Sequence, residues 1–340
     1  MKTVFVAVSL ALGLPVAALV GTFVYISAPN WPVADYDNLV TYESLPPGPD
    51  SPKQLSPEQL SPKQLSVVSY NIGYLSGLTN QQAVERDKTL HESNQVTAVE
   101  ALAARSPDIL ALQEIDFDAY RSFNVNQQEA VSMALGMAFG AIAVNWDKRY
   151  VPFPYWPPSA HYRQVISGQA ILSRYPIRRN ERLVLEQVPT NPFYYNALYL
   201  DRIAQVSEID VSGQSLIVIN VHLEAFDAPT RTRQTQAVRD LAEGYAQDFP
   251  VLLLGDFNSS LNRDESEDSH SIQILLDSPV LATAPPPQAE GFTFPSDQPQ
   301  YRLDYIFYTP ATLEVVDAEV VAAAAQSSDH LPIQAQVRLR

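Results

Sequence analysis

The chain has 340 residues, of which 46% are hydrophobic and 18% charged, and these fractions are typical of a globular protein with one large domain or two ordinary ones. Its formal net charge of -16 indicates an acidic surface, which repels phosphate-rich polymers such as nucleic acid unless a local basic patch intervenes. It contains no cysteine, which excludes disulfides, thiolate metal sites and cysteine nucleophiles, so any metal must be held by oxygen or imidazole.

An uncharged segment runs from Val4 to Ser27, with Lys2 before it and no basic residue after it until Lys53. Its length favours a retained membrane-spanning helix, which needs about 20 apolar residues, over a cleaved signal peptide with an apolar core of about 7–15. Pro15 keeps the signal peptide open as an alternative, and a buried core helix is a third. The single Lys2 places the rest of the chain outside the cytoplasm, either membrane-anchored or, after cleavage, secreted. Residues 1–27 are therefore expected to form a membrane anchor or signal peptide.

Residues 28–65 are expected to form a proline-rich linker. Three tandem five-residue repeats fill residues 51–65, and each begins with Ser-Pro and ends with Leu. Proline at every fifth position disfavours both regular helix and strand, so the segment predicts a partly extended tether that holds the globular part off the membrane. Binding of a specific partner by the repeats is the alternative.

Residues 66–340 alternate short apolar runs with helical patterns, which predicts one domain. The predicted strands are Ser66–Tyr70, Ile109–Leu112, Ala170–Leu172, Ala204–Ile209, Leu216–Val221, Val251–Leu254, Tyr305–Phe307 and Pro332–Val337. Val96, Val99 and Leu102 share one face of a predicted helix, and residues 211–214 read as a hairpin turn. Hairpins mixed with helices indicate an α+β sandwich of largely antiparallel sheets covered by helices.

Polar and acidic residues recur at the ends of these apolar strands. They are Asn71, Glu114, His222, Asp256, Asn258, Asp304, Asp329 and His330. Any one of them alone is more often a helix cap or a turn residue. Together they supply the carboxylate and amide oxygens that a hard cation such as Mg²⁺ prefers, brought from separate strand ends.

Two of the five histidines in the chain, His222 and His330, belong to this set. Asp329 directly before His330 suits a base whose imidazole is oriented by a carboxylate. Asp256 and Asn258 lie two residues apart, so in an extended segment they point to the same side, where one can align water and the other can hold a phosphoryl oxygen. The remaining histidines, His91, His161 and His270, fall in predicted loops and are expected to be surface or substrate-side residues.

Seven short blocks occur in an order that resembles the endonuclease/exonuclease/phosphatase superfamily. They are SYN at 69–71, LQE at 112–114, GQAILSRYPI at 168–177, NVHL at 220–223, GDFN at 255–258, LDYI at 303–306 and SDHLP at 328–332. This superfamily includes DNase I-like nucleases, abasic-site endonucleases, inositol polyphosphate 5-phosphatases and neutral sphingomyelinases. The resemblance implies a four-layer α/β/β/α sandwich, DNase I-like, with the active site at one end, and a metal-dependent phosphoesterase activity.

The resemblance also implies roles for the candidate residues. Glu114, Asn71 and Asp329 would hold Mg²⁺, for which Mn²⁺ could substitute. Asp329 and His330 would together form the catalytic base, with His330 acting on water or on the scissile phosphate. Asp256 would position or deprotonate the nucleophilic water.

Three further roles follow from the same resemblance. Asn258 would stabilise charge on the transition state, and Asp304 would orient a histidine or share the metal shell. His222 is similar to the second histidine of the DNase I-like and sphingomyelinase branches, which favours these branches over the abasic-site endonucleases. The sequence does not show which carboxylate pairs with His222.

The substrate is open at this point. Two aromatic-rich stretches, residues 150–162 and 193–199, could form a lipid-facing rim, stack on bases or simply pack against the sandwich. Four arginines near the blocks could contact phosphate or lie on solvent-exposed faces, namely Arg163, Arg202, Arg231 and Arg233. The anchor and the acidic surface favour a monomeric phosphodiesterase that cleaves a small or lipid phosphodiester by in-line water attack. An extracytoplasmic DNase I-like endonuclease is the alternative, and a non-catalytic, membrane-tethered binding scaffold is the alternative of another class.

Overall fold

The computed structural model describes residues 2–42, 64–80, 82–262, 268–286 and 291–340. Two β-sheets carry the fold. The first contains, in spatial order, β1 (Leu39–Thr41), β4 (Phe139–Val151), β5 (Arg163–Ser173), β3 (Ile109–Ala119), β2 (Gln64–Asn71), β13 (Ile333–Leu339) and β12 (Leu313–Val320). The second contains β10 (Ala282–Ala284), β11 (Asp304–Tyr308), β9 (Val251–Asp256), β8 (Gln214–His222), β7 (Ile203–Val211) and β6 (Ile177–Val184). The pairs β2–β3 and β8–β9 are parallel and the other neighbouring pairs are antiparallel, as predicted.

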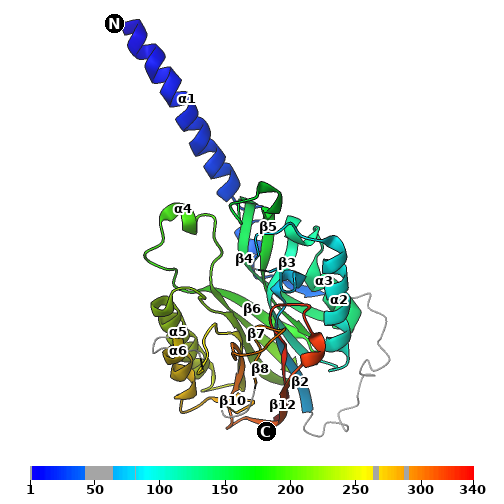
Figure 1. The fold of residues 1–340 in the computed structure, drawn as a ribbon. Helices are drawn as coiled ribbons and strands as arrows, with labels where there is room; N and C mark the ends of the chain where they lie inside the picture. The colour runs from blue at the N-terminus through cyan, green and yellow to red at the C-terminus, as the bar shows by residue number, and fades with distance from the viewer. Residues whose placement is uncertain (1, 43–63, 81, 263–267, 287–290) are drawn as a thin grey trace.

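Helices cover the outer faces of both sheets (Figure 1). The first sheet is covered by α2 (Lys88–Ala103) and α3 (Gln127–Leu135), and the second by α5 (Ala228–Tyr245) and α6 (Asp268–Leu276). The remaining helices are α1 (Lys2–Ser27) and the short α4 (Phe193–Asn196), and the 3-10 turns are η1 (Val33–Asp35), η3 (Gly73–Leu75), η4 (Tyr120–Ser122), η5 (Pro158–Ala160) and η6 (Ala322–Ala324).

The core follows from the alternation of side chains along the strands. Val67 of β2 and Val218 of β8 point into the layer between the two sheets and are fully buried there. The adjacent Val68 points outward to the α2 and α3 layer, and Ile217 points outward to the α5 and α6 layer. The result is a four-layer α/β/β/α sandwich with apolar cores between successive layers, which is the architecture that the family resemblance implied.

The predicted strands are all present, and several are longer than the apolar runs that predicted them. The hairpin turn expected at 211–214 joins β7 to β8, with Ser212 at φ 56° and Gly213 at φ 93°. Positive φ at both central residues is the turn geometry that matches the twist of paired strands.

The predicted buried face of α2 is partly wrong. The side chains that α2 buries are those of His91, Asn94, Ala98, Ala101 and Leu102. Leu102 therefore lies on the inner face as predicted, whereas Val96 is 57% exposed. Apolar spacing alone misplaced the face because polar side chains of α2 occupy buried positions where they form hydrogen bonds, such as that from Asn94 Nδ2 to the Leu75 carbonyl.

The segment after α1 packs on the domain. Asp147 of β4 accepts hydrogen bonds from the backbone N–H groups of Asn30, at 2.7 Å, and Trp31, at 2.8 Å. Strand β1 then pairs with β4 along Leu39–Thr41. Residues 28–42, which the sequence assigned to the linker, are thus part of the folded body, and the five-residue repeats, apart from the start of β2, lie outside the described residues.

Helix α1 projects from the body at the end that carries α4 (Figure 1). Its side chains are described from Pro15 onward. In the described parts of the chain, no helix is long and apolar enough to cross a bilayer. The anchor or signal segment expected at residues 1–27 stays a prediction.

Candidate active site

Neighbouring strand ends bring the central residues of the site together. His222 at the end of β8 lies opposite Asp256 at the end of the parallel strand β9. Asp304 at the start of the antiparallel strand β11 lies opposite Asp256 on the other side. The sheet itself therefore places Asp256 between His222 and Asp304.

A glycine makes this close approach possible. Gly255 has φ +136°, and a Cβ atom built on it would lie 2.0 Å from the carbonyl oxygen of Val221 on β8. A larger residue at position 255 would force β8 and β9 apart at the point where they present His222 and Asp256.

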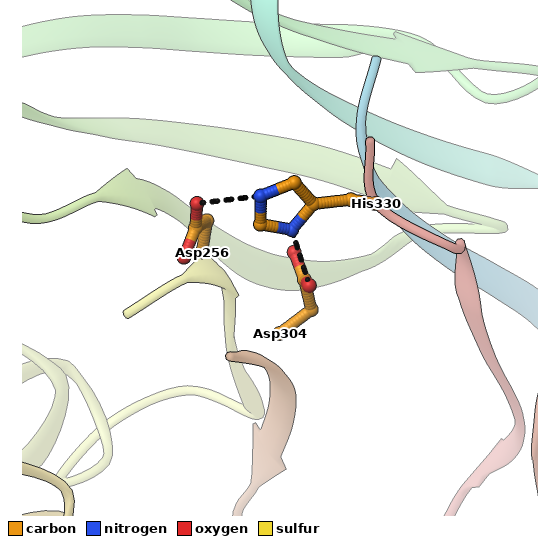
Figure 2. A group of neighbouring side chains, drawn as sticks. All are labelled: Asp256, Asp304 and His330. Carbon is orange, nitrogen blue, oxygen red and sulfur yellow. Dashed lines mark hydrogen bonds and ion pairs between the residues drawn. The ribbon is translucent and has the colours of Figure 1, made fainter. Parts of the chain in front are cut away.

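His330, just before β13, lies between two carboxylates (Figure 2). Its Nδ1 atom is 2.9 Å from Oδ2 of Asp304, and its Nε2 atom is 3.7 Å from Oδ2 of Asp256. Burial acts to lower the pKa of His330, but Asp304 and Asp256 outweigh it and hold this pKa well above its ordinary value. This shift favours the protonated form of the His330 ring, and the bond to Asp304 fixes its orientation.

Asp329 turns away from the ring that it was expected to orient. Its Oδ1 atom accepts hydrogen bonds from Asn80 Nδ2 at 3.2 Å and from Ser328 Oγ at 3.3 Å. Adjacent side chains diverge at this bend before β13, so the carboxylate that meets the His330 ring comes from Asp304. The expectation that Asp329 pairs with His330 is corrected accordingly.

His222 is held in the opposite state. Its Nε2 atom lies 3.5 Å from Asp256 Oδ2 and 3.8 Å from Glu114 Oε1. Burial, together with the positive charges of Arg202 and His330, lowers the pKa of His222 well below its ordinary value. Asp256 between the two rings has its pKa raised to about 7, mainly by burial. The site thus pairs a neutral histidine with a cationic one, an arrangement suited to acid–base chemistry.

Glu114 and Asp329 share one hydrogen-bond donor, the side-chain amide of Asn80. Glu114 sits at an irregularity in β3, with φ 49°, where the pairing with β5 shifts register between Leu112 and Ile115. The amide nitrogen of Asn80 donates to Glu114 Oε2 at 2.8 Å as well as to Asp329. Burial and the neighbouring charge of Asp329 raise the pKa of Glu114. His330 and Arg202 offset only part of this effect on the pKa of Glu114, and carboxylate oxygens are ligands that suit a hard divalent cation.

Asn71, expected as a further metal ligand, holds Asp256 in place. Its Nδ2 atom donates to Asp256 Oδ2 at 2.9 Å, and its Oδ1 atom accepts from the N–H of Gly73 at 3.1 Å. Both ends of its amide are therefore used within the protein.

A second group could also hold a metal. Ligand atoms of Asp256, Asp304 and His330 lie within 4.8 Å of one another. Here, however, the Nδ1 atom of His330 is bonded to Asp304 and is not free to bind a metal. We therefore favour the Glu114 and Asp329 side as the metal centre.

Asn258 completes the polar part of the site. Its backbone N–H donates to Asp256 Oδ1 at 2.8 Å, and its Nδ2 atom donates to the carbonyl of Leu223 at 3.0 Å. Its φ of 50° is uncommon for a residue other than glycine, although asparagine tolerates it well. The backbone here is shaped so that Asp256 and Asn258 both line the same cavity.

This cavity has a volume of about 560 Å³ and is lined by two unlike kinds of side chain. Glu114, His222, Asp256 and His330 are among its polar groups. The walls are aromatic, and their rings are those of Tyr74, Trp146, Phe153, Tyr155, Tyr162, Tyr194, Tyr195, Tyr199 and Phe226. Both aromatic stretches that the sequence singled out thus contribute to one pocket next to the reactive groups.

Of the four arginines named from the sequence, Arg202 lines the cavity. It is 5% exposed, and among the described residues its Nε and Nη1 atoms have no hydrogen-bond partner. Its charge is balanced by Glu224, whose Oε2 atom lies 3.5 Å from Nε. The other three face elsewhere: Arg163 lies over the Tyr120 ring, Arg231 bonds the carbonyl of Glu224, and Arg233 pairs with Glu186.

Some contributors to the site carry no sequence signal. Asn80 lies in an ordinary loop, and only its bonds to Glu114 and Asp329 reveal its place. Arg121 also lines the cavity, where it pairs with Asp116 at 2.8 Å and lies under the Tyr74 ring at 3.4 Å.

Two of the remaining histidines differ from the loop prediction, because His91 lies in α2 and the backbone of His270 lies in α6. His91 is 4% exposed within α2, and its Nε2 atom lies 2.9 Å from Gln127 Nε2, so the loop prediction was wrong. His161 bonds the hydroxyl of Tyr150 at 2.8 Å beside the cavity walls. The side chain of His270 lies outside the described residues.

Comparison with known proteins agrees with this geometry. The model of the Endonuclease/Exonuclease/phosphatase family matches residues 68–330. The chain is 29% identical over 184 residues to the uncharacterized protein YbhP of Escherichia coli K12, covering 53% of this chain and 66% of YbhP. It is 25% identical over 247 residues to Nocturnin of Rattus norvegicus, covering 67% of this chain and 51% of Nocturnin. The chain thus spans between half and two thirds of these relatives.

A solved structure shares the fold. The endonuclease/exonuclease/phosphatase from Beutenbergia cavernae DSM 12333 superimposes with a TM-score of 0.58 at 22% identity, covering 82% of this chain and 72% of that one. At this identity the likeness concerns the fold alone.

Proposed function

Because the chain belongs to the endonuclease/exonuclease/phosphatase family, whose members are typically metal-dependent phosphoesterases, we propose that it hydrolyses a small or lipid phosphodiester. The observation that carries the proposal is the cationic His330, held by Asp304 beside Asp256, in a cavity with aromatic walls. A phosphodiester has a charged phosphoryl centre and an organic group, so it can contact both the polar residues and the aromatic walls of this pocket.

Glu114 and Asp329 would hold the metal, with Asn80 able to turn its amide oxygen toward it. Oxygen ligands favour Mg²⁺, and Mn²⁺ is the natural substitute. Bound there, the ion would neutralise charge that develops on the phosphoryl oxygens.

The protein residues divide the remaining work. Asp256, held by Asn71 and by the N–H of Asn258, would position the attacking water and take its proton. His330 as a cation would face the phosphoryl group, and Arg202, which lines the cavity, would add positive charge beside it. Water then attacks phosphorus in line with the leaving oxygen, and no covalent enzyme intermediate is needed.

Substrate size follows from the cavity. A phosphate ion alone would leave most of the roughly 560 Å³ unfilled, and the aromatic walls would then face water. A diester brings a second organic group that can occupy this space. The net charge of -16 disfavours duplex DNA, and a membrane-associated or extracytoplasmic setting is part of the same proposal.

A nuclease is the second candidate, favoured by the same aromatic walls, because bases stack on such rings. Its signature would be a steep loss of DNA cleavage with rising salt, since phosphate contacts release counterions. A catalytically inactive scaffold is the candidate of another class.

A substrate panel distinguishes these candidates. The full chain is assayed on generic phosphomonoesters, phosphodiesters, plasmid DNA and dispersed phospholipids, each with Mg²⁺ and with EDTA. The proposal predicts metal-dependent turnover of phosphodiesters, with little turnover of monoesters or DNA. Salt-sensitive DNA cleavage as the main activity would favour the nuclease, and zero turnover of every phosphoester would favour the scaffold.

A further inference from the structure

Five exposed aromatic side chains either line the cavity or are sequence neighbours of residues that line it. Tyr155 and Trp156, between β4 and β5, are 71% and 76% exposed; Phe193 and Tyr194, between β6 and β7, are 77% and 56%; and Phe226, after β8, is 77%. Three of them, Tyr155, Tyr194 and Phe226, also line the cavity, which places them at its opening. We call these five residues the aromatic rim.

Helix α1 meets the same rim. The Phe23 ring contacts the Phe193 ring edge-on at 6.1 Å, and Arg149 of β4 lies over the Tyr25 ring at 5.1 Å. Figure 1 shows α1 leaving the body at the end that carries α4, the helix that begins with Phe193. The rim is therefore continuous with the base of the helix.

The outward side chains of α1 are uncharged where they are described, and most of them are apolar. Val16, Leu19, Val20 and Val24 are 58% to 71% exposed. No charged residue occurs between Lys2 and Asp35. The aromatic rim and the base of α1 thus form one apolar surface. Exposed apolar surfaces of this kind indicate interaction sites.

The chemistry of the rim selects its partner. Tryptophan and tyrosine have rings with an apolar body and a polar edge, which suits the boundary between lipid headgroups and acyl chains. The five rim residues carry no charge, and the chain as a whole carries -16, so attraction to anionic lipid cannot drive docking. A second protein would have to cover both the rim and α1.

We propose that the aromatic rim lies on the surface of a zwitterionic lipid bilayer, with the cavity opening toward the lipid. Docking at this surface does not depend on turnover. Only the corollary, that substrate enters the cavity from the lipid phase, rests on the proposed function.

Tryptophan fluorescence tests the proposal. The chain has three tryptophans, and Trp156 is the exposed one at the rim, whereas Trp146 is 6% exposed and Trp31 packs against Phe117. The full chain is mixed with phosphatidylcholine vesicles whose acyl chains carry bromine, a short-range quencher. We expect quenching in the wild type and loss of most of that quenching in Trp156→Phe, although this variant still sediments with the vesicles.

Two controls separate the outcomes. His330→Ala, inactive under the proposed function, should be quenched like the wild type, so failure of the function and failure of docking are distinguishable. Phosphatidylserine added to the vesicles should not strengthen binding. Equal quenching of wild type and Trp156→Phe, absence of quenching, or binding that requires phosphatidylserine would overturn the proposal. If Trp156 fluorescence is not quenched and the protein dimerises as its concentration rises, the surface would instead bind a second copy of the chain.

Discussion

The Nδ1 atom of His330 lies 2.9 Å from Asp304 Oδ2, 26 residues earlier in the chain, whereas the carboxylate of the adjacent Asp329 points to Asn80. Two aspartates that look equivalent from the sequence therefore have different partners. Asp304 bonds the His330 ring, and Asp329 shares the side-chain amide of Asn80 with Glu114.

This difference predicts distinct kinetics for two isosteric variants. Asp304→Asn removes the charge that keeps His330 cationic and should lower kcat by about 10²–10⁴-fold, the usual contribution of a positioned histidine. Asp329→Asn should mainly raise the Mg²⁺ concentration needed for half-maximal activity. Steady-state rates across a Mg²⁺ titration measure both effects. If high Mg²⁺ restored the activity of Asp304→Asn, Asp304 would belong to the metal site instead.

Arg202 is predicted to contact the substrate while balancing a buried carboxylate. Arg202→Met should lower kcat/KM roughly 10- to 100-fold, the equivalent of a lost charged hydrogen bond. It should also lower the free energy of unfolding by several kcal/mol, because Glu224 is left buried and unpaired.

The double variant with Glu224→Gln separates these two effects. Removal of both charges should recover most of the stability, measured by urea unfolding, but not the activity. If activity returns together with stability, Arg202 has only a structural role.

Metal binding is predicted to stabilise the protein through Glu114. Burial and Asp329 raise the pKa of this carboxyl, so its charged form is unfavourable without a cation. Glu114→Gln should therefore raise stability in EDTA, yet abolish the gain on adding Mg²⁺, which for the wild type is about 2.7 kcal/mol at 100 times Kd. Thermal unfolding with and without Mg²⁺ checks this, and Glu100→Gln on the exposed face of α2 is the matched control. Unchanged Mg²⁺ stabilisation in Glu114→Gln would place the ion elsewhere.

His91 is predicted to make stability depend on pH. Burial lowers its pKa in the folded state, against opposing effects of Asp116 and Glu92. The folded protein therefore binds this proton less readily than the unfolded chain, whose histidine pKa is about 6.5. Stability from His91 is present above that value and is lost as pH falls below it.

The comparison uses His91→Gln, which can still accept a hydrogen bond from Gln127. Urea unfolding at pH 7.5 and 5.5 should show a smaller loss in the variant than in the wild type. Some loss should remain, because His222 is also buried with a lowered pKa. Identical losses in the two proteins would exclude His91 as a contributor.

The sequence predicted most of the buried strands but missed β4, whose residues Phe139–Val151 are mostly buried. Runs such as Val251–Leu254 in β9 are apolar on both faces, because each lies between another sheet and a helix layer. The edge strand β6 was missed, since its residues Ile177–Val184 are mostly polar and only partly buried. β1 was missed because it follows an uncharged segment and lies in a stretch assigned to a linker.

The site was predictable where chemistry sits at strand ends. Asp256, His222 and Asp304 meet because neighbouring strands end at one edge, which a pattern of strands can suggest. The hydrogen bond between Asn80 and Asp329 joins residues 249 positions apart, and no motif around Asn80 predicts it. Which aspartate bonds His330 depends on the direction of the side chains at the bend before β13, and a sequence pattern does not predict that direction.

The central claim is that His330 acts in a metal-dependent hydrolytic site. It is tested most directly by comparing wild type and His330→Ala on the best phosphodiester of the panel, at saturating Mg²⁺. The account predicts a variant that unfolds cooperatively like the wild type and whose activity lies near the EDTA background. A folded His330→Ala protein that keeps most of the Mg²⁺-dependent activity would contradict it.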